Sequence, residues 1–206
     1  MNGFERRKHI KIEQIFSVSI QLFFKYGFHK VSVNEIAKMA NVSPATIYNY
    51  FGTKERLYAE MLLNWMDKQL EKYESILDSE LAFVEKTKKI MLLEASNVKT
   101  LSDELPNISA SEFGELAQML ESYTEDKVKR FFMKFVEVGK REGYIRLDLT
   151  EEKAMIYFTM FKNELGRHWE ADNEDRITRS IDPLIELFFY GIAGRIQDRQ
   201  KITGSE

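Results

Sequence analysis

The 206-residue chain contains no cysteine, only three prolines and only ten glycines. Without cysteine it cannot form a disulfide, a thiolate metal site or a cysteine nucleophile, and this absence fits a reducing compartment. Proline and glycine are the residues that helices tolerate least, and few stretches alternate between apolar and polar residues as half-buried strands do. We therefore predict an all-α fold with about nine helices.

Signals for membrane segments, metal sites and catalysis are also missing. No run of about 18 apolar residues is present, and the charged start MNGFERRKHI lacks the apolar core of a signal peptide. The three histidines, His9, His29 and His168, are scattered without paired metal-ligand spacing. There is no glycine-rich phosphate loop and no G-x-S-x-G motif. We therefore expect no metal, no cofactor and no enzymatic activity.

The charge is distributed unevenly along the chain. Residues 1–60 hold nine Lys and Arg against five Asp and Glu, a net charge of +4. The remaining residues hold 21 against 28, a net charge of −7. A basic N-terminal module on an acidic body is suited to an anionic partner at one end only.

The stretch from Ser32 to Lys54 predicts two short helices separated by a tight turn. Ser32 and Glu35 have the spacing of a capping box, in which the serine caps the helix and the glutamate reaches back. Asn41 can take the left-handed backbone conformation that often ends a helix. Ser43 and Pro44 then restart the chain as the N-cap and the first helical residue.

The second of these helices has two distinct faces. Ile47, Tyr50 and Phe51 lie three or four residues apart and can face inward. The side chains left on the outer face are small, polar or aromatic: Ala45, Thr46, Tyr48 and Asn49. A short helix of this kind, braced by another, is typical of a helix-turn-helix DNA reader.

Residues from about Ile15 to Met61 resemble the DNA-binding domain of TetR-family transcriptional regulators. The matching positions are Phe23, Gly27, Phe28, Val33, Ile36, Ala37, Ala40, Val42, Ser43, Ile47, Tyr48, Phe51, Lys54 and Leu57. Two positions depart from the pattern, since Asn41 replaces a common glycine and Val18 a usual alanine. Asparagine can supply the same turn, and Val18 implies only slightly different packing.

The resemblance implies a cytoplasmic bacterial regulator that binds double-stranded DNA as a homodimer. Its N-terminal helix-turn-helix domain is expected at residues 1–52. A helical-bundle domain for ligand binding and dimerisation is expected at residues 53–200, followed by a disordered tail at 201–206.

The predicted DNA contacts combine base reading with phosphate binding. The methyl groups of Ala45 and Thr46 can meet thymine C5-methyl groups, whereas Tyr48 and Asn49 can bond a phosphate or a base. Tyr48 and Lys54 correspond to residues that the resemblance places near the DNA backbone. The predicted DNA-binding set is Ser32, Ser43, Pro44, Ala45, Thr46, Tyr48, Asn49 and Lys54, with Arg6 and Arg7.

Arg6 and Arg7 belong to a basic segment that opens the first long helix, predicted to run to about Tyr26 and to end at Gly27. Positive charge at a helix N-terminus opposes the helix dipole, and a phosphate would offset that cost. A solvated basic tip is the alternative interpretation of this segment.

The rest of the chain predicts longer amphipathic helices. The expected helices are 53–77, 80–98 and 112–141, a further helix that begins at the Thr150 cap, and a last helix near residues 181–192. A polar loop is expected at 102–111, and 144–149 is expected to be an extended connector rather than a strand. The sequence leaves open whether Pro183 begins the last helix or kinks it.

The last two predicted helices are apolar on more than one side. The last helix spans about 200° of apolar surface, beyond the stripe of about 100° typical of a surface helix. A second subunit would cover the excess, through a four-helix interface. The predicted interface residues are Met155, Phe158, Leu184, Phe188, Gly191 and Ile192.

A small apolar or aromatic ligand is expected to bind the C-terminal body. The apolar and aromatic lining is predicted to be Trp65, Tyr73, Met91, Met119, Tyr123, Phe135, Phe161 and Trp169. The polar groups available are Glu94, Asn163, Glu164 and His168. Core packing is the alternative role of such stripes.

These features predict a homodimeric repressor that binds a near-palindromic operator and is released by the ligand. The alternative is an architectural DNA-binding protein without an effector, which would occupy many genomic sites instead of one or a few.

Overall fold

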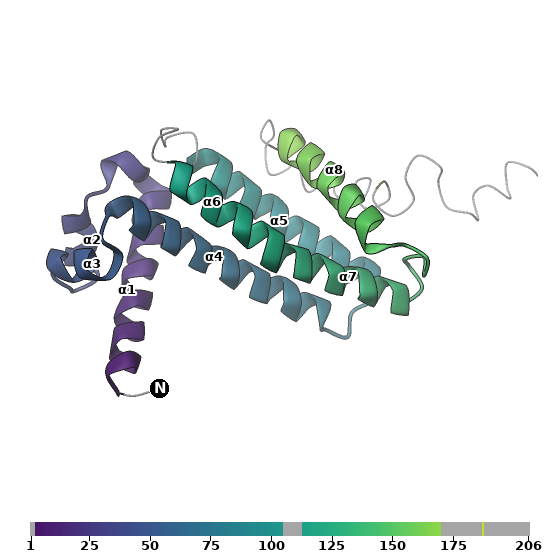
Figure 1. The fold of residues 1–206 in the computed structure, drawn as a ribbon, viewed down its shortest axis with the longest axis horizontal. Coiled ribbons are helices and arrows are strands. Elements are labelled where there is room, and N and C mark those ends of the chain that lie inside the picture. Colours follow the sequence, from purple (N-terminus) through teal and green to yellow (C-terminus); the bar gives the residue numbers. More distant parts are fainter. Residues whose placement is uncertain (1–2, 105–112, 170–186, 188–206) are drawn as a thin grey trace, which may run out of the picture. The chain divides into compact units, whose positions relative to one another are not determined.

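The computed structural model describes residues 3–104, 113–169 and 187. These residues are helical with no strand (Figure 1), which confirms the predicted all-α class. The elements are α1 (Gly3–Tyr26), η1 (Phe28–Lys30), α2 (Val33–Met39), α3 (Pro44–Phe51), α4 (Lys54–Leu77), α5 (Phe83–Glu104), α6 (Phe113–Tyr123), the π-helical η3 (Thr124–Val128), α7 (Lys129–Arg141) and α8 (Glu151–Trp169). The predicted helix near 181–192 and the tail lie outside the described residues.

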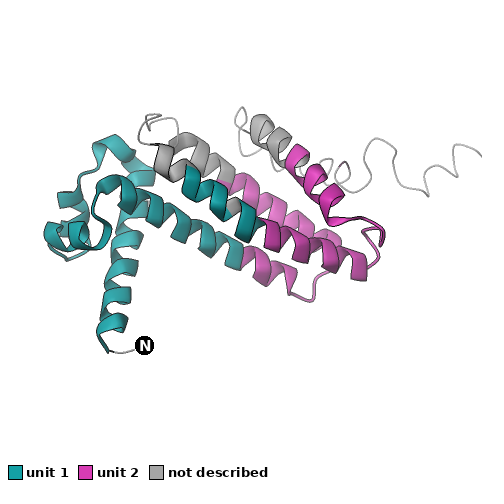
Figure 2. Ribbon diagram, in the orientation of Figure 1, with its two compact units in different colours: residues 1–71, 100–128 teal, residues 72–99, 129–206 magenta. Residues whose placement is uncertain are grey.

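Two compact units make up the chain (Figure 2). Unit 1 comprises residues 1–71 and 100–128, and unit 2 comprises residues 72–99 and 129–206. Helices α4 and α5 therefore each supply residues to both units. The DNA-binding domain predicted at residues 1–52 lies inside unit 1, which also contains α6.

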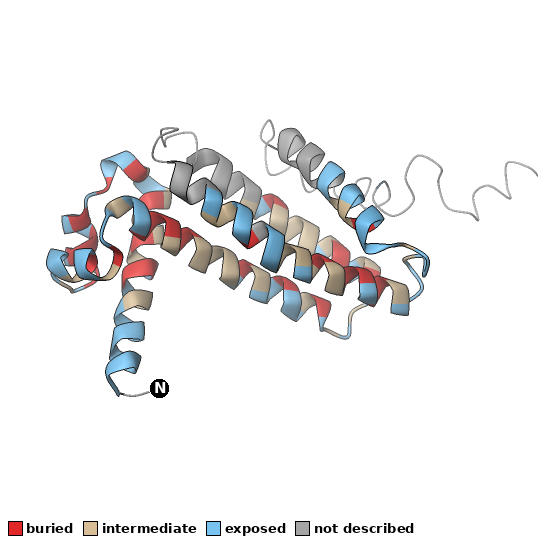
Figure 3. Ribbon diagram, viewed as in Figure 1, coloured by how far each residue is buried: buried red, intermediate tan, exposed pale blue. Residues whose placement is uncertain are grey.

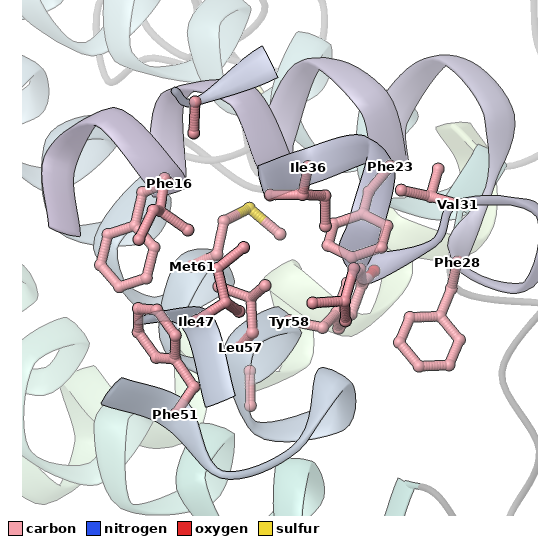
Figure 4. Packing of buried hydrophobic residues seen from close by; sticks show 14 of the residues in the cluster. Phe16, Phe23, Phe28, Val31, Ile36, Ile47, Phe51, Leu57, Tyr58 and Met61 are labelled. Atoms are coloured by element: carbon pink, nitrogen blue, oxygen red, sulfur yellow. The ribbon is translucent and has the colours of Figure 1, made fainter. Parts of the chain in front are cut away.

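Unit 1 is built around an aromatic core supplied by its first helices and by the start of α4 (Figures 3 and 4). The Phe23 ring lies 5.8 Å from that of Phe28 and 5.1 Å from that of Tyr58, centroid to centroid. Met119 and Leu120 of α6 pack against the same core. Aromatic pairs stabilise a fold beyond the contribution of the apolar area that they bury. This core therefore fixes the first helices relative to one another within unit 1.

The ends of the helices in unit 1 follow the local sequence signals. Helix α1 ends at Tyr26 as predicted, and Gly27, at φ +82°, donates its N–H to the Phe23 carbonyl at 2.8 Å. Asn41 has φ +52°, the left-handed conformation predicted for it. Among the described residues it is the one non-glycine with positive φ, and asparagine is among the residues that tolerate it best.

Unit 2 has a second core, in which phenylalanines of α5, α7 and α8 meet. The Phe83 and Phe135 rings are 4.8 Å apart, and the Phe132 and Phe158 rings are 4.2 Å apart. Gly139 of α7 permits this packing, because a Cβ there would lie 2.6 Å from Ile145 Cδ1 and 2.7 Å from Phe83 Cζ. Any side chain at that position would force these neighbours to move.

Glu142, just after α7, holds the start of α5. Its carboxylate accepts the Phe83 backbone N–H at 3.1 Å and the Lys86 Nζ at 3.1 Å. Lys86 is only 5% exposed. Glu142 thus satisfies one unpaired N–H of the first turn of α5 and balances a buried charge.

Two predicted helices differ from the structure. Helix α5 runs from Phe83 to Glu104 rather than from 80 to 98, so it extends into the predicted loop and ends two residues before Pro106, which cannot continue a helix. The helix predicted at 112–141 is α6 and α7 joined by the π-helical segment. The connector at 144–149 contains no strand, as predicted, and Thr150 caps α8 by accepting the Lys153 N–H at 3.4 Å.

Candidate nucleic-acid interface

The N-terminus of α2 is closed by the predicted capping box. Ser32 Oγ accepts the Glu35 N–H at 3.2 Å, and the Glu35 carboxylate accepts the Ser32 N–H at 2.8 Å. The Ser32 hydroxyl also donates to Glu35, at 2.7 Å. The bond from the Ser32 N–H is the main cause that lowers the pKa of Glu35 below its usual value. A phosphate contact by Ser32 would therefore compete with Glu35.

The turn between α2 and α3 is tight and internally bonded. Ala40 donates its N–H to the Ile36 carbonyl at 2.8 Å, and Val42 donates to the Ala37 carbonyl at 3.0 Å. The left-handed Asn41 lies between them. This turn brings α3 out of line with α2, as a helix-turn-helix requires.

Helix α3 begins with the predicted serine cap and proline. Ser43 Oγ accepts the Thr46 N–H at 3.1 Å and lies 2.9 Å from Thr46 Oγ1. Pro44 is the first helical residue, where its missing N–H costs nothing.

The two faces of α3 differ sharply in exposure. Ile47 and Phe51 are 1% and 2% exposed and pack into the unit 1 core. Ala45, Tyr48 and Asn49 are exposed, with Tyr48 at 50%, while Thr46 and Tyr50 are half-buried. The exposed face of α3 therefore carries small and polar groups, while its opposite face is fixed in the unit 1 core.

Lys54 is the first residue of α4, beside the reading helix. Its Nζ lies 4.3 Å from the centroid of the Phe28 ring, a cation–π contact. Thr53 precedes it as the cap of α4 and accepts the Arg56 N–H at 3.1 Å. No local pattern links Lys54 with Phe28, so sequence reasoning missed this pairing.

The basic start of α1 is exposed. Arg6, Arg7 and Lys11 have exposed side chains, and Lys8 Nζ lies 5.6 Å from the centroid of the Tyr50 ring on α3. One basic residue of this segment thus contacts the reading helix. Within unit 1, α1 and α3 can serve a single anionic partner.

The predicted ligand-binding residues are divided between the two units. Trp65, Met119 and Tyr123 belong to unit 1, where Trp65 and Met119 pack against the core. The members of unit 2 whose side chains the structure describes are Tyr73, Met91, Glu94 and Phe135. The side chains of Phe161, Asn163, Glu164, His168 and Trp169 lie outside the described set.

Two of the predicted ligand residues in unit 2 are bonded to each other. Tyr73 donates its hydroxyl to Glu94 Oε2 at 2.5 Å and accepts a bond from Asn97 Nδ2 at 2.6 Å. The Phe131 ring lies 5.7 Å from the Tyr73 ring. Asn97 was not foreseen, although its position three residues after Glu94 on α5 places both on one helix face.

The predicted dimer residues that can be located lie on α8. Met155 and Phe158 are half-buried against the unit 2 core. The exposed apolar residues of α8 are instead Ile156 at 55%, Tyr157 at 41% and Met160 at 67%. Leu184, Phe188, Gly191 and Ile192 lie outside the described residues.

Metal clusters and membrane spans were also sought among the residues that the structure describes. No group of three or more His, Asp or Glu side chains there could hold a metal ion. None of the helices over those residues is long and apolar enough to cross a membrane.

The geometry of unit 1 defines a helix-turn-helix DNA-binding protein. Residues 15–61 match the family described as "Bacterial regulatory proteins, tetR family". Residues 15–61 thus form a DNA-binding domain like that of the TetR family, and the protein is a DNA-binding transcriptional regulator.

Two curated relatives align over most of the chain. One is the uncharacterized HTH-type transcriptional regulator YhgD of Bacillus subtilis, 24% identical over 84% of this chain and 92% of that protein. Another is the HTH-type transcriptional repressor KstR2 of Rhodococcus jostii, 26% identical over 70% of this chain and 72% of that protein. Both are named as regulators rather than enzymes.

Solved structures share the fold. The fatty acid degradation regulator FadR from Bacillus halodurans has a TM-score of 0.67 at 20% identity, covering 90% of this chain and 97% of that one. FadR from Bacillus subtilis, in complex with stearoyl-CoA, has a TM-score of 0.63 at 19% identity, covering 87% and 98%. At this level of identity the likeness concerns the fold.

Proposed function

We propose that this protein is a homodimeric repressor that reads a near-palindromic operator through α3. The observation that supports this most directly is the outer face of α3, where Ala45, Tyr48 and Asn49 are exposed on a helix anchored by Ile47 and Phe51. Two such helices, related by a two-fold axis, would enter successive major grooves. Genome-wide footprinting should find one or a few sites, starting upstream of the gene itself, whereas many sites would favour an architectural role.

The contacts divide into base reading and backbone binding. Ala45, Thr46 and Asn49 are the proposed base readers, through methyl and amide groups. Tyr48, Ser43, Pro44 and Lys54 are proposed to face the backbone, with Arg6 and Arg7 reaching further phosphates or the minor groove. No arginine lies on α3, so bidentate recognition of guanine from this helix is not expected.

The substitutions Lys54→Ala and Thr46→Ala should separate these two roles. Loss of the Lys54 charge should weaken binding to all sequences alike and reduce the slope of log K against log salt by about one. Loss of the Thr46 methyl and hydroxyl should change sequence preference, with about 1–3 kcal/mol of altered discrimination at one base pair. Binding assays with operator variants at several salt concentrations measure both the salt dependence and the sequence preference.

Lys134→Ala is the matched control, because Lys134 is a unit 2 lysine paired with Asp78. It should leave both the affinity and the salt dependence unchanged. Equal loss for all DNA sequences upon Thr46→Ala would contradict the base-reading role.

The proposed effector is a ligand with a long apolar chain, of the acyl-CoA class. Two considerations support this choice: the aromatic character of the unit 2 helices, and the structural similarity to Bacillus subtilis FadR, which was solved with stearoyl-CoA. The residues proposed to bind this effector are Tyr73, Met91, Glu94 and Phe135. The other predicted ligand residues stay predictions: Trp65, Met119, Tyr123, Phe161, Asn163 and His168.

Addition of long-chain acyl-CoA should lower operator affinity. A reciprocal coupling of about 1–3 kcal/mol corresponds to a roughly 5- to 150-fold loss. The measurement is a DNA titration with and without acyl-CoA of increasing chain length, with free coenzyme A as the control. Unchanged affinity at every chain length would exclude this effector class.

A further inference from the structure

One carboxylate on α4 holds two side chains of the segment that follows α6. Lys127 Nζ donates to Asp67 Oδ1 at 2.6 Å and to Oδ2 at 2.8 Å, and the Tyr123 hydroxyl donates to Oδ1 at 3.0 Å. The Lys127 ammonium also lies 5.1 Å from the centroid of the Tyr123 ring. All three residues belong to unit 1. Tyr123 is 7% exposed, so its hydroxyl depends on this bond for a partner.

The backbone between those two donors is not α-helical. Residues Thr124–Val128 form a π-helical turn between α6 and α7. A π-turn closes i→i+5 hydrogen bonds and is rare, usually as a single turn inside an α-helix. Tyr123 and Lys127 are four residues apart, a spacing that places two side chains on one face of a helix. Both side chains reach the same carboxylate of Asp67.

The same part of α4 is bonded to α1. Glu13 accepts Asn64 Nδ2 at 3.1 Å and Lys68 Nζ at 2.6 Å. The bond from Lys68 lowers the pKa of Glu13 below its usual value, so its carboxylate stays charged at neutral pH. Residues 64–68 of α4 thus carry polar links to α1 and to the π-turn, within a single unit. Both links consist of hydrogen bonds and ion pairs, so they are additional to the apolar packing of the unit 1 core.

We propose that Asp67 holds a conformational switch: its bonds to Tyr123 and Lys127 keep Thr124–Val128 closed in the π conformation, and their release lets this turn open. The change reaches α1 through Asn64 and Lys68, which flank Asp67 and bind Glu13. The part of the switch that concerns operator affinity rests on the proposed function.

Asp67→Asn in the full chain tests the switch with little change of shape. Hydrogen exchange of the amides at 124–131 should accelerate at least about tenfold, because the turn opens more often once its side chains lose their common partner. Exchange in the first half of α1 should also accelerate, and operator affinity should change by more than about threefold. Asp78→Asn is the matched control, since it breaks the surface ion pair with Lys134 and should change neither quantity.

Deletion of Glu125, an exposed residue inside the π-turn, is the second test. Removing one residue lets the segment continue as α-helix without Asp67, so the deletion combined with Asp67→Asn should restore slow exchange at 124–131. The switch is overturned if Asp67→Asn exchanges like the parent protein, or if exchange accelerates without any effect on α1. If the parent protein binds no operator at all, the proposed function fails while the exchange experiment still decides the switch.

Discussion

Replacing Glu142 by alanine is expected to lower the free energy of unfolding by about 3 kcal/mol, the cost of leaving a buried charge without its partner. The carboxylate serves two groups, the Phe83 backbone N–H and the Lys86 ammonium. Lys86 is 5% exposed and cannot reach water without disturbing the packing around it. Urea denaturation of the parent and the variant measures the difference.

Two further variants separate the two functions of Glu142. Glu142→Gln keeps an acceptor for the Phe83 N–H but removes the charge, so it should lose less than the alanine variant. Adding Lys86→Met to Glu142→Gln removes the buried charge as well and should recover part of the loss, because paired removal of buried ions is often close to neutral. An alanine variant within about 0.5 kcal/mol of the parent, the range of ordinary surface changes, would refute the argument.

If α8 forms part of the proposed dimer interface, Met160→Glu should dissociate the proposed homodimer at micromolar concentration. Operator affinity should then fall by about 100-fold or more, since linked binding sites gain roughly 10²–10⁴. Met160 is 67% exposed, and Ile156, four residues earlier on α8, is 55% exposed. In a two-fold interface each substitution appears twice, so two buried carboxylates would face an apolar surface. Sedimentation and DNA titration measure the two effects.

Leu147→Glu is the control for the dimer prediction. Leu147 is 80% exposed but lies in the connector before α8, so this variant should stay dimeric and bind DNA normally. A Met160→Glu protein that remains dimeric would exclude this face of α8 from the interface. In that case the excess apolar surface of α8 would need a different explanation.

The local structure of the reading head was predictable because its signals are short in range. The Ser32–Glu35 box, the left-handed Asn41 and the Ser43–Pro44 start each concern residues at most three apart, and the structure bears out all three. The burial of Ile47 and Phe51 followed from helical spacing alone. Which of the exposed α3 residues touch DNA stays a prediction.

The interruption between α6 and α7 was not predictable. The apolar pattern of 112–141 reads as one helix, and the π-turn within it depends on Asp67, which lies 56 residues before Tyr123. Periodicity reports which residues are apolar, whereas the register of a helix also depends on the partners that its side chains find. Such partners are set by the tertiary fold.

The sequence by itself determined the helical class, the helix caps and turns of the reading head, and the apolar excess of the C-terminal helices, since each depends on composition or on neighbouring residues. Only the tertiary structure decided which face of α8 is left exposed, that Lys54 lies over Phe28, and that Glu142 balances Lys86. Those contacts join residues far apart in the chain. Their geometry follows from how whole helices pack, and no short sequence pattern records it.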